Sequence, residues 1–89
     1  MDERETTSST AERDAATESA VLQLVLALHP APITFEDLAR ELDADADTMA
    51  RDALERAIRD LDRAGLLHRR SGIVLPTRAA LRFDELMER

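Results

Sequence analysis

Arginine is the residue type in this 89-residue chain that is best placed to do chemistry. All twelve basic residues are arginine, and five of them gather in one part of the chain. Arg56, Arg59 and Arg63 recur at steps of three and four residues, which places them on one side of a helix. Arg69 and Arg70 follow as an adjacent pair. A guanidinium group donates paired hydrogen bonds to phosphate or guanine, so this pattern favours binding of DNA.

The other residue types give little support for catalysis or metal binding. The chain has no cysteine and only two glycines, so it has no disulfide, no cysteine-ligated metal and no glycine-rich phosphate loop. His29 has no second ligand at a suitable spacing, and His68 near Ser71 lacks an arguable oxyanion hole. The acids of residues 43–47 alternate with alanine but lack the glycine and glutamate of a calcium loop. We therefore expect no enzyme, no catalytic residue, no metal and no cofactor.

A long amphipathic helix over residues 47–64 carries the arginine stripe. Its apolar residues recur at three- and four-residue steps, and Gly65 then ends the helix. With Leu54 at the centre of the buried side, Arg51 and Glu55 lie on one flank. The side facing away from the core is predicted to carry Met49, Asp52, Arg56, Arg59 and Arg63.

A hairpin and a last helix follow. Residues 66–70 and 73–75 are predicted strands, with Ser71 and Gly72 as a two-residue turn. Thr77 can cap the last helix. The apolar residues of that helix either close the core or meet a second copy of the protein: Ala79, Ala80, Phe83, Leu86 and Met87.

The chain begins with a predicted disordered acidic tail over residues 1–17, because this stretch is polar and has no hydrophobic period. Residues 18–29 form a helix that Pro30 ends, and Ile33 suggests a very short strand. A short helix over residues 34–42 follows. Thr34 and Asp37 form its capping box. Residues 18–89 are thus expected to be one domain.

The net charge of −7 is unevenly distributed. Residues 1–18 have two arginines against six acids, whereas residues 19–82 have nine arginines against ten acids. The folded part is therefore close to neutral, and screening weakens repulsion by a distant tail. No apolar run approaches the length of a membrane span, and the N-terminus is not signal-like, so we expect a cytoplasmic protein without a membrane partner.

The order of these elements resembles a winged helix-turn-helix domain: mainly α with a small β-hairpin, in the order α-(β)-α-α-β-β-α. The resemblance covers residues 20–77 and is closest at ITFEDLARELDADADTMARDALERAIRDLDRAGLLHRRSGIVLPT. The trailing PTRAALRFDEL looks like the fourth helix of short, mostly uncharacterised regulators from high-GC bacteria. The resemblance implies a recognition helix over residues 47–64 and a wing at the hairpin tip. The implied DNA contacts are Thr48, Met49, Arg51, Asp52, Arg56, Arg59 and Arg63 in the helix, and Arg69, Arg70 and Ser71 in the wing.

The acids near the helix leave a second interpretation open. Asp47, Asp52 and Glu55 lie at its N-terminal end, which usually enters the groove, and carboxylates repel phosphates. They also stand four residues before Arg51, Arg56 and Arg59, the favourable orientation for local ion pairs. A solvated, salt-bridged helix face is therefore the alternative to a DNA-binding face.

Two functions follow from the sequence. The first is a DNA-binding transcription regulator that acts as a dimer, because a monomer with five candidate arginines among acids should bind DNA weakly. The expected dimer forms through the first and last helices. The second function is an adaptor that binds a protein partner instead of DNA. The residues expected on the dimer or partner face are Phe83, Leu86 and Met87.

Overall fold

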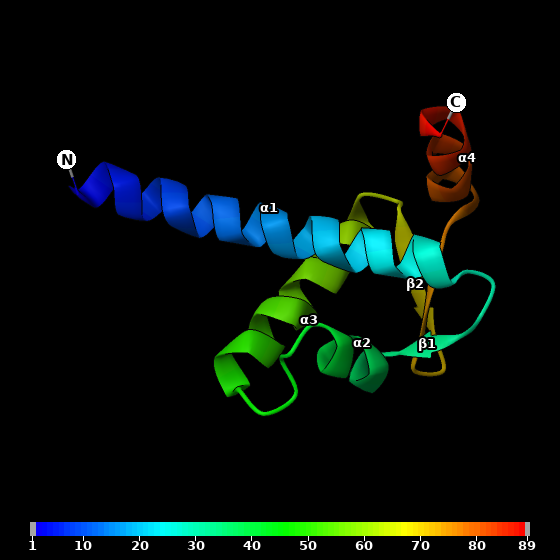
Figure 1. Cartoon of the computed structure of the whole chain (residues 1–89), viewed down its shortest axis with the longest axis horizontal. Coiled ribbons are helices and arrows are strands. Elements are labelled where there is room, and N and C mark those ends of the chain that lie inside the picture. Colours follow the sequence, from blue (N-terminus) through cyan, green and yellow to red (C-terminus); the bar gives the residue numbers. More distant parts are fainter. Residues whose placement is uncertain (1, 89) are drawn as a thin grey trace.

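The computed structural model describes the backbone of residues 2–88 and the side chains of residues 11–88. Within this part, the chain forms four helices and a three-stranded antiparallel sheet, which confirms the predicted fold class (Figure 1). The elements in chain order are α1 (Asp2–Leu28), β1 (Ile33–Thr34), α2 (Phe35–Glu41), α3 (Thr48–Arg63), β2 (Leu67–Arg70), β3 (Ile73–Pro76) and α4 (Arg78–Met87).

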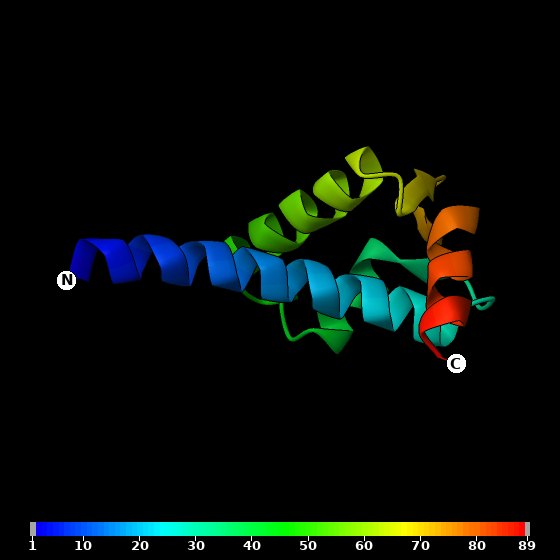
Figure 2. The same cartoon turned by 90° about the horizontal axis from the view of Figure 1, so that it is seen from above.

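Helix α1 is longer than the sequence predicts. It begins at Asp2, so residues 2–17 are helical where a disordered tail was expected. Met1 lies outside the described residues, as does Arg89 at the end of the predicted domain. Residues 11–16 are exposed, and α1 extends past the other elements (Figures 1 and 2). Alanine, glutamate and arginine are good helix formers, and extending a helix that the core already holds costs little.

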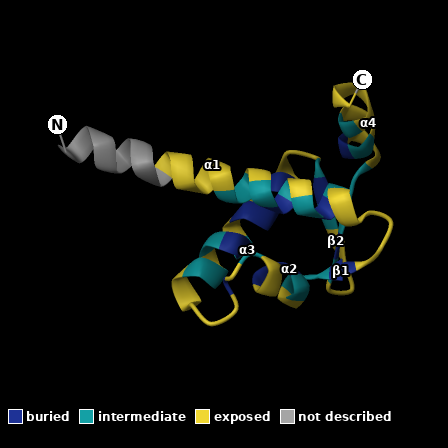
Figure 3. Cartoon of the chain, viewed as in Figure 1, coloured by how far each residue is buried: buried dark blue, intermediate teal, exposed yellow. Residues whose placement is uncertain are grey.

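The hydrophobic core lies between α1, α3 and the inner side of the sheet. The largest fully buried side chains come from all of these elements and from α2 (Figure 3). Among the described residues, no polar or charged residue is buried. The core therefore depends on apolar packing. Its largest members are Val21, Val25, Leu38, Leu54, Ile58, Leu67 and Val74.

The predicted local signals set the element boundaries. Thr34 and Asp37 form both hydrogen bonds of the capping box, each 3.1 Å long. Gly65 follows Ala64, the C-cap of α3, and takes a left-handed φ of 81°. Ser71 and Gly72 have φ of 54° and 80°, which is the pattern of a tight hairpin turn.

Strand β3 is the central strand of the sheet. Its residue Ile73 pairs with Arg70 of β2 on one side and with Thr34 of β1 on the other. Strand pairing on both sides of β3 thus reaches the hairpin turn, and the hairpin does not extend beyond the sheet. The turn lies next to the start of α2. Among the described residues, no helix is both long and apolar enough to cross a membrane.

Candidate nucleic-acid interface

The outward side of α3 is built as the periodicity predicts. Leu54, Ala57, Ile58 and Leu61 are buried against the core. Met49 near the start of the helix is 80% exposed, although it is a large apolar residue. The other residues predicted to face away from the core are exposed as well: Asp52, Arg56, Arg59 and Arg63. Thr48, a predicted DNA contact at the start of the helix, is also exposed.

The three arginines of the stripe are loosely held. A distance of 3.8 Å separates Nη2 of Arg56 from Oδ1 of Asp14 in α1. The nearest carboxylate oxygen to Arg63 is that of Asp60, at 4.0 Å. Arg59 forms no ion pair with any of residues 11–88. Exposed pairs at such distances contribute little stability, so these guanidinium groups remain accessible to another anion.

The local ion pairs predicted within α3 are wrong. Asp47 caps the helix, since its Oδ1 accepts a hydrogen bond from the backbone N–H of Met49 at 3.0 Å. Arg51 instead donates two hydrogen bonds to Glu36 of α2, at 3.1 and 2.7 Å. Glu55 accepts two hydrogen bonds from Arg69 of β2, at 3.0 and 3.1 Å.

Both of these paired arginines also lie over the ring of Phe35. The guanidinium carbons of Arg51 and Arg69 are 5.1 and 5.7 Å from the ring centroid, within the range of a cation–π interaction. We call Phe35, Glu36, Arg51, Glu55 and Arg69 the Phe35 cluster. It joins α2, α3 and β2, and its two arginines balance its two glutamates. The guanidinium of Arg51 lowers the pKa of Glu36, chiefly through its hydrogen bonds, and the same bonds raise the pKa of Arg51.

The Phe35 cluster contains two residues that were predicted to contact DNA, Arg51 and Arg69. Arg51 lies on the flank of α3 with its guanidinium turned toward α2, and Arg69 of β2 is paired with α3. Neither is left as a free cation for phosphate. Sequence reasoning did not identify Phe35 and Glu36, because each ion pair joins residues 14 or 15 positions apart, and no local spacing marks such a pair. It also missed Asp14, which was assigned to the tail.

At the hairpin turn, Arg70 and Ser71 are exposed. Successive strand residues point to opposite sides of a sheet, and Arg70 is paired with Ile73, whereas Arg69 is paired with the buried Val74. Arg70 therefore points to the side of the sheet away from the core. It forms no ion pair with residues 11–88. The hairpin tip thus presents one unpaired arginine instead of the predicted two.

The three residues predicted for a dimer or partner face are on α4, at the end of the molecule opposite the start of α3 (Figure 1). Phe83 is 60% exposed, Leu86 51% and Met87 67%. Ala80 is the buried residue of this helix among those described. Helix α4 therefore does not close the core with its apolar stripe.

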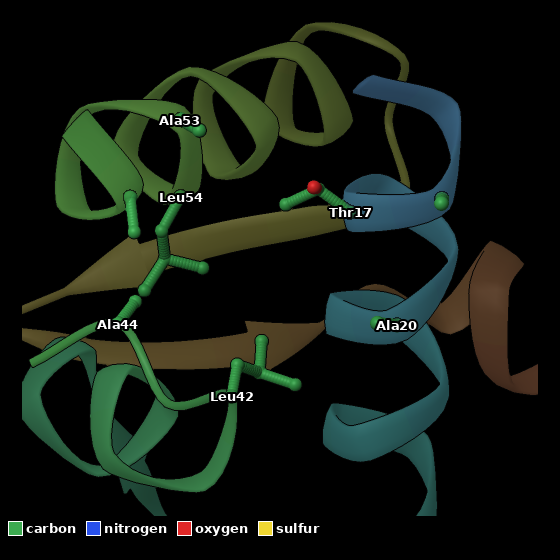
Figure 4. A pocket seen from close by; sticks show the side chains of 8 residues that line it. Thr17, Ala20, Leu42, Ala44, Ala53 and Leu54 are labelled. Carbon is green, nitrogen blue, oxygen red and sulfur yellow. The ribbon is translucent and has the colours of Figure 1, made fainter. Parts of the chain in front are cut away.

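A groove of about 270 Å³ separates α1 from the start of α3 (Figure 4). Its lining side chains are apolar apart from the hydroxyl of Thr17, and none of them is titratable. Groups that transfer protons or bind anions are thus missing from its walls. The described lining residues are Ala16, Thr17, Ala20, Leu42, Ala44, Ala50, Ala53 and Leu54. Within residues 11–88, no three metal-ligating side chains gather at one place.

Comparison of the chain with models of protein families, with curated proteins and with solved structures finds no match.

Proposed function

We propose that this protein is a winged helix-turn-helix DNA-binding protein that acts in transcription regulation, with α3 as the helix that enters the major groove. One observation carries the proposal: α3 has loosely held arginines on its outward side, and the one glutamate of the same helix is neutralised by an arginine of β2. Arg56, Arg59 and Arg63 are exposed and held weakly or not at all. Glu55, the acid between them and the wing, is neutralised by Arg69.

The Phe35 cluster removes part of the repulsion that DNA would meet. A carboxylate paired with a guanidinium presents much less negative potential than a free carboxylate at the same place. Glu36 and Glu55 are both paired in this way. The cluster also joins α3 to α2 and β2 through four hydrogen bonds, in addition to the packing of α3 on the core.

The residues of this surface suit different parts of a DNA duplex. Arg59 and Arg63 reach phosphates or the guanine edge, and Arg70 at the hairpin turn reaches a neighbouring phosphate. Near the start of α3, Met49 suits the methyl group of thymine and Asp52 can accept a hydrogen bond from cytosine.

The experiment is a fluorescence anisotropy titration of a labelled random-sequence duplex at several salt concentrations between 20 and 200 mM. Arg59→Ala should weaken binding at low salt. It should also lower the slope of log affinity against log salt by about 0.9, the value of one phosphate contact, and adding Arg63→Ala should roughly double that loss.

Arg13→Ala is the matched control, because Arg13 is an exposed arginine of α1 that forms no ion pair with residues 11–88. Its substitution changes the net charge equally but should leave the slope unchanged. Equal effects of the two substitutions would contradict a DNA-binding role of α3. Absence of binding at 20 mM salt would overturn the proposal and favour an adaptor that binds another protein.

A further inference from the structure

Two acidic residues of α1 continue the buried side of this helix beyond the hydrophobic core. Asp14 stands seven residues, or about two helical turns, before the buried Val21. Glu18 stands in the same relation to the buried Val25. Residues two turns apart lie on the same side of a helix, and this side of α1 packs against α3. Both carboxylates are therefore placed toward α3.

The cation that meets these acids is the guanidinium of Arg56 in α3. Its Nη2 is 3.8 Å from Oδ1 of Asp14, and both side chains are about half exposed. Asp14 and Arg56 border a small hollow between the two helices, which Glu18 and Asp60 line as well. Arg56 thus shares this hollow with two acids of α1 and one of its own helix.

This contact distinguishes Arg56 from the other two arginines on the outward side of α3. Within residues 11–88, Arg63 has its nearest carboxylate on its own helix, and Arg59 forms no ion pair. A phosphate that approaches Arg56 meets the negative charge of Asp14 at the same place. The pair is long and exposed, so it can be broken, but breaking it reduces what Arg56 gains from DNA.

We propose that α1 lowers the DNA affinity of α3 through an autoinhibitory contact, in which Asp14, with Glu18 beside it, competes with phosphate for Arg56. This inference rests on the proposed function, because it concerns the same surface of α3. The exchange requires only that two side chains turn, since neither Asp14 nor Arg56 belongs to the core. The contact therefore acts without a change in the fold.

The salt dependence of binding reports whether Arg56 contacts DNA. An arginine that neutralises a phosphate releases counterions and adds about 0.9 to the slope of log affinity against log salt. While Asp14 competes for Arg56, this arginine should add clearly less. Asp14→Asn removes the competing charge and keeps the size of the side chain, so the full contribution of Arg56 should then be measured.

Anisotropy titrations of the full chain with a labelled random-sequence duplex between 20 and 200 mM salt test the proposal. Asp14→Asn should raise the affinity at 20 mM salt by about three- to fivefold, and adding Glu18→Gln should raise it further. Glu12→Gln is the matched control, because Glu12 is an exposed acid of α1 about 200° around the helix from Asp14. It forms no ion pair with residues 11–88, and its substitution should raise the affinity less than twofold. An equal gain from the control would overturn the proposal.

Arg56→Ala tests whether Asp14 acts through this arginine. In the natural chain the substitution should lower the salt slope by less than about 0.5, and in the Asp14→Asn variant by about 0.9. A loss of about 0.9 in both proteins would show that Asp14 does not compete for Arg56, and would overturn the proposal.

The same titrations separate this inference from the proposed function. If the natural chain binds DNA and Arg59→Ala lowers its salt slope, but Asp14→Asn gives no gain, the autoinhibitory contact alone is overturned. If neither the natural chain nor Asp14→Asn binds at 20 mM salt, both proposals are overturned.

Discussion

At the scale of single residues, the clearest electrostatic feature is the paired contact between Arg51 and Glu36. Two parallel hydrogen bonds join the guanidinium to the carboxylate, which is the strongest geometry for such a pair. Desolvation acts in the opposite direction, but the hydrogen bonds prevail, and the pKa of Glu36 is held below its usual value of 4.5. Because the charged form is favoured in the folded state, the pair links folding to pH.

Glu36→Gln should therefore destabilise the protein near neutral pH and have less effect in acid. A carboxyl group whose pKa is lowered by folding adds stability above its unfolded value of 4.5, and that stability is lost as pH falls through the lower folded value. The measurement is the melting temperature of both proteins by circular dichroism between pH 7 and pH 2.5. The two curves should converge below pH 4.5.

Glu41→Gln is the control for this titration, since Glu41 is on the same helix and forms no ion pair with residues 11–88. Loss of any carboxylate changes the net charge, so some effect of pH is expected from both substitutions. A difference of equal size and pH range for Glu41→Gln would show that net charge, and not the contact with Arg51, is responsible.

At the scale of the elements, the hairpin turn is the most tightly specified connection. Both residues of the turn, Ser71 and Gly72, have positive φ. The next residue, Ile73 of β3, is paired with β2 on one side and with β1 on the other. A Cβ atom added at Gly72 would meet no other atom within 4 Å. Any cost of a side chain there is thus conformational and not steric.

Gly72→Ala should lower the free energy of unfolding by about 1 kcal/mol, because a left-handed backbone conformation is less favourable by about this much for a residue with a Cβ atom. Ser71→Asn should act in the opposite direction by a few tenths of a kcal/mol, since Asn-Gly is the preferred sequence for this turn. Urea denaturation of the three proteins measures both effects. An unchanged midpoint for Gly72→Ala would contradict the left-handed turn.

The sequence predicts the elements from α2 to α4 within one or two residues. The reason is that their ends are marked by local chemistry: the Thr34 capping box, the glycine after α3 and the caps at Asp47 and Thr77. The buried and outward sides of α3 also follow from periodicity alone. Such signals need no knowledge of the tertiary structure.

Two features could not be predicted in this way. Helix α1 continues to Asp2 through residues without a hydrophobic period, so the sequence offers no sign of where it begins. The ion pairs of Arg51 and Arg69 depend on how α2 and β2 pack beside α3. The i,i+4 rule selects partners within one helix and cannot include carboxylates or guanidinium groups that packing brings from other elements.

At the scale of the whole molecule, the balance of charge decides how well α3 can approach DNA. Residues 48–63 have four arginines and four acids, so the helix itself is neutral. The turn before it adds Asp43, Asp45 and Asp47, and the whole chain has a net charge of −7. At 20 mM salt, charges act over about 20 Å, roughly half of the 43 Å length of the molecule. The aspartates of the turn should thus oppose DNA more than acids at the far end do.

Replacing Asp43 and Asp45 by asparagine should raise the affinity for a random duplex at 20 mM salt by about threefold or more, and by less at 200 mM, where screening is stronger. Asn is well suited to position 43, where φ is 62°, and Asp47 stays in place as the cap of α3. Asp84→Asn in α4 with Glu88→Gln at its C-cap changes the net charge equally, at the opposite end of the molecule. Anisotropy titrations of both double variants separate the two effects, because an equal gain from both would mean that net charge alone, and not the acids next to α3, limits DNA binding.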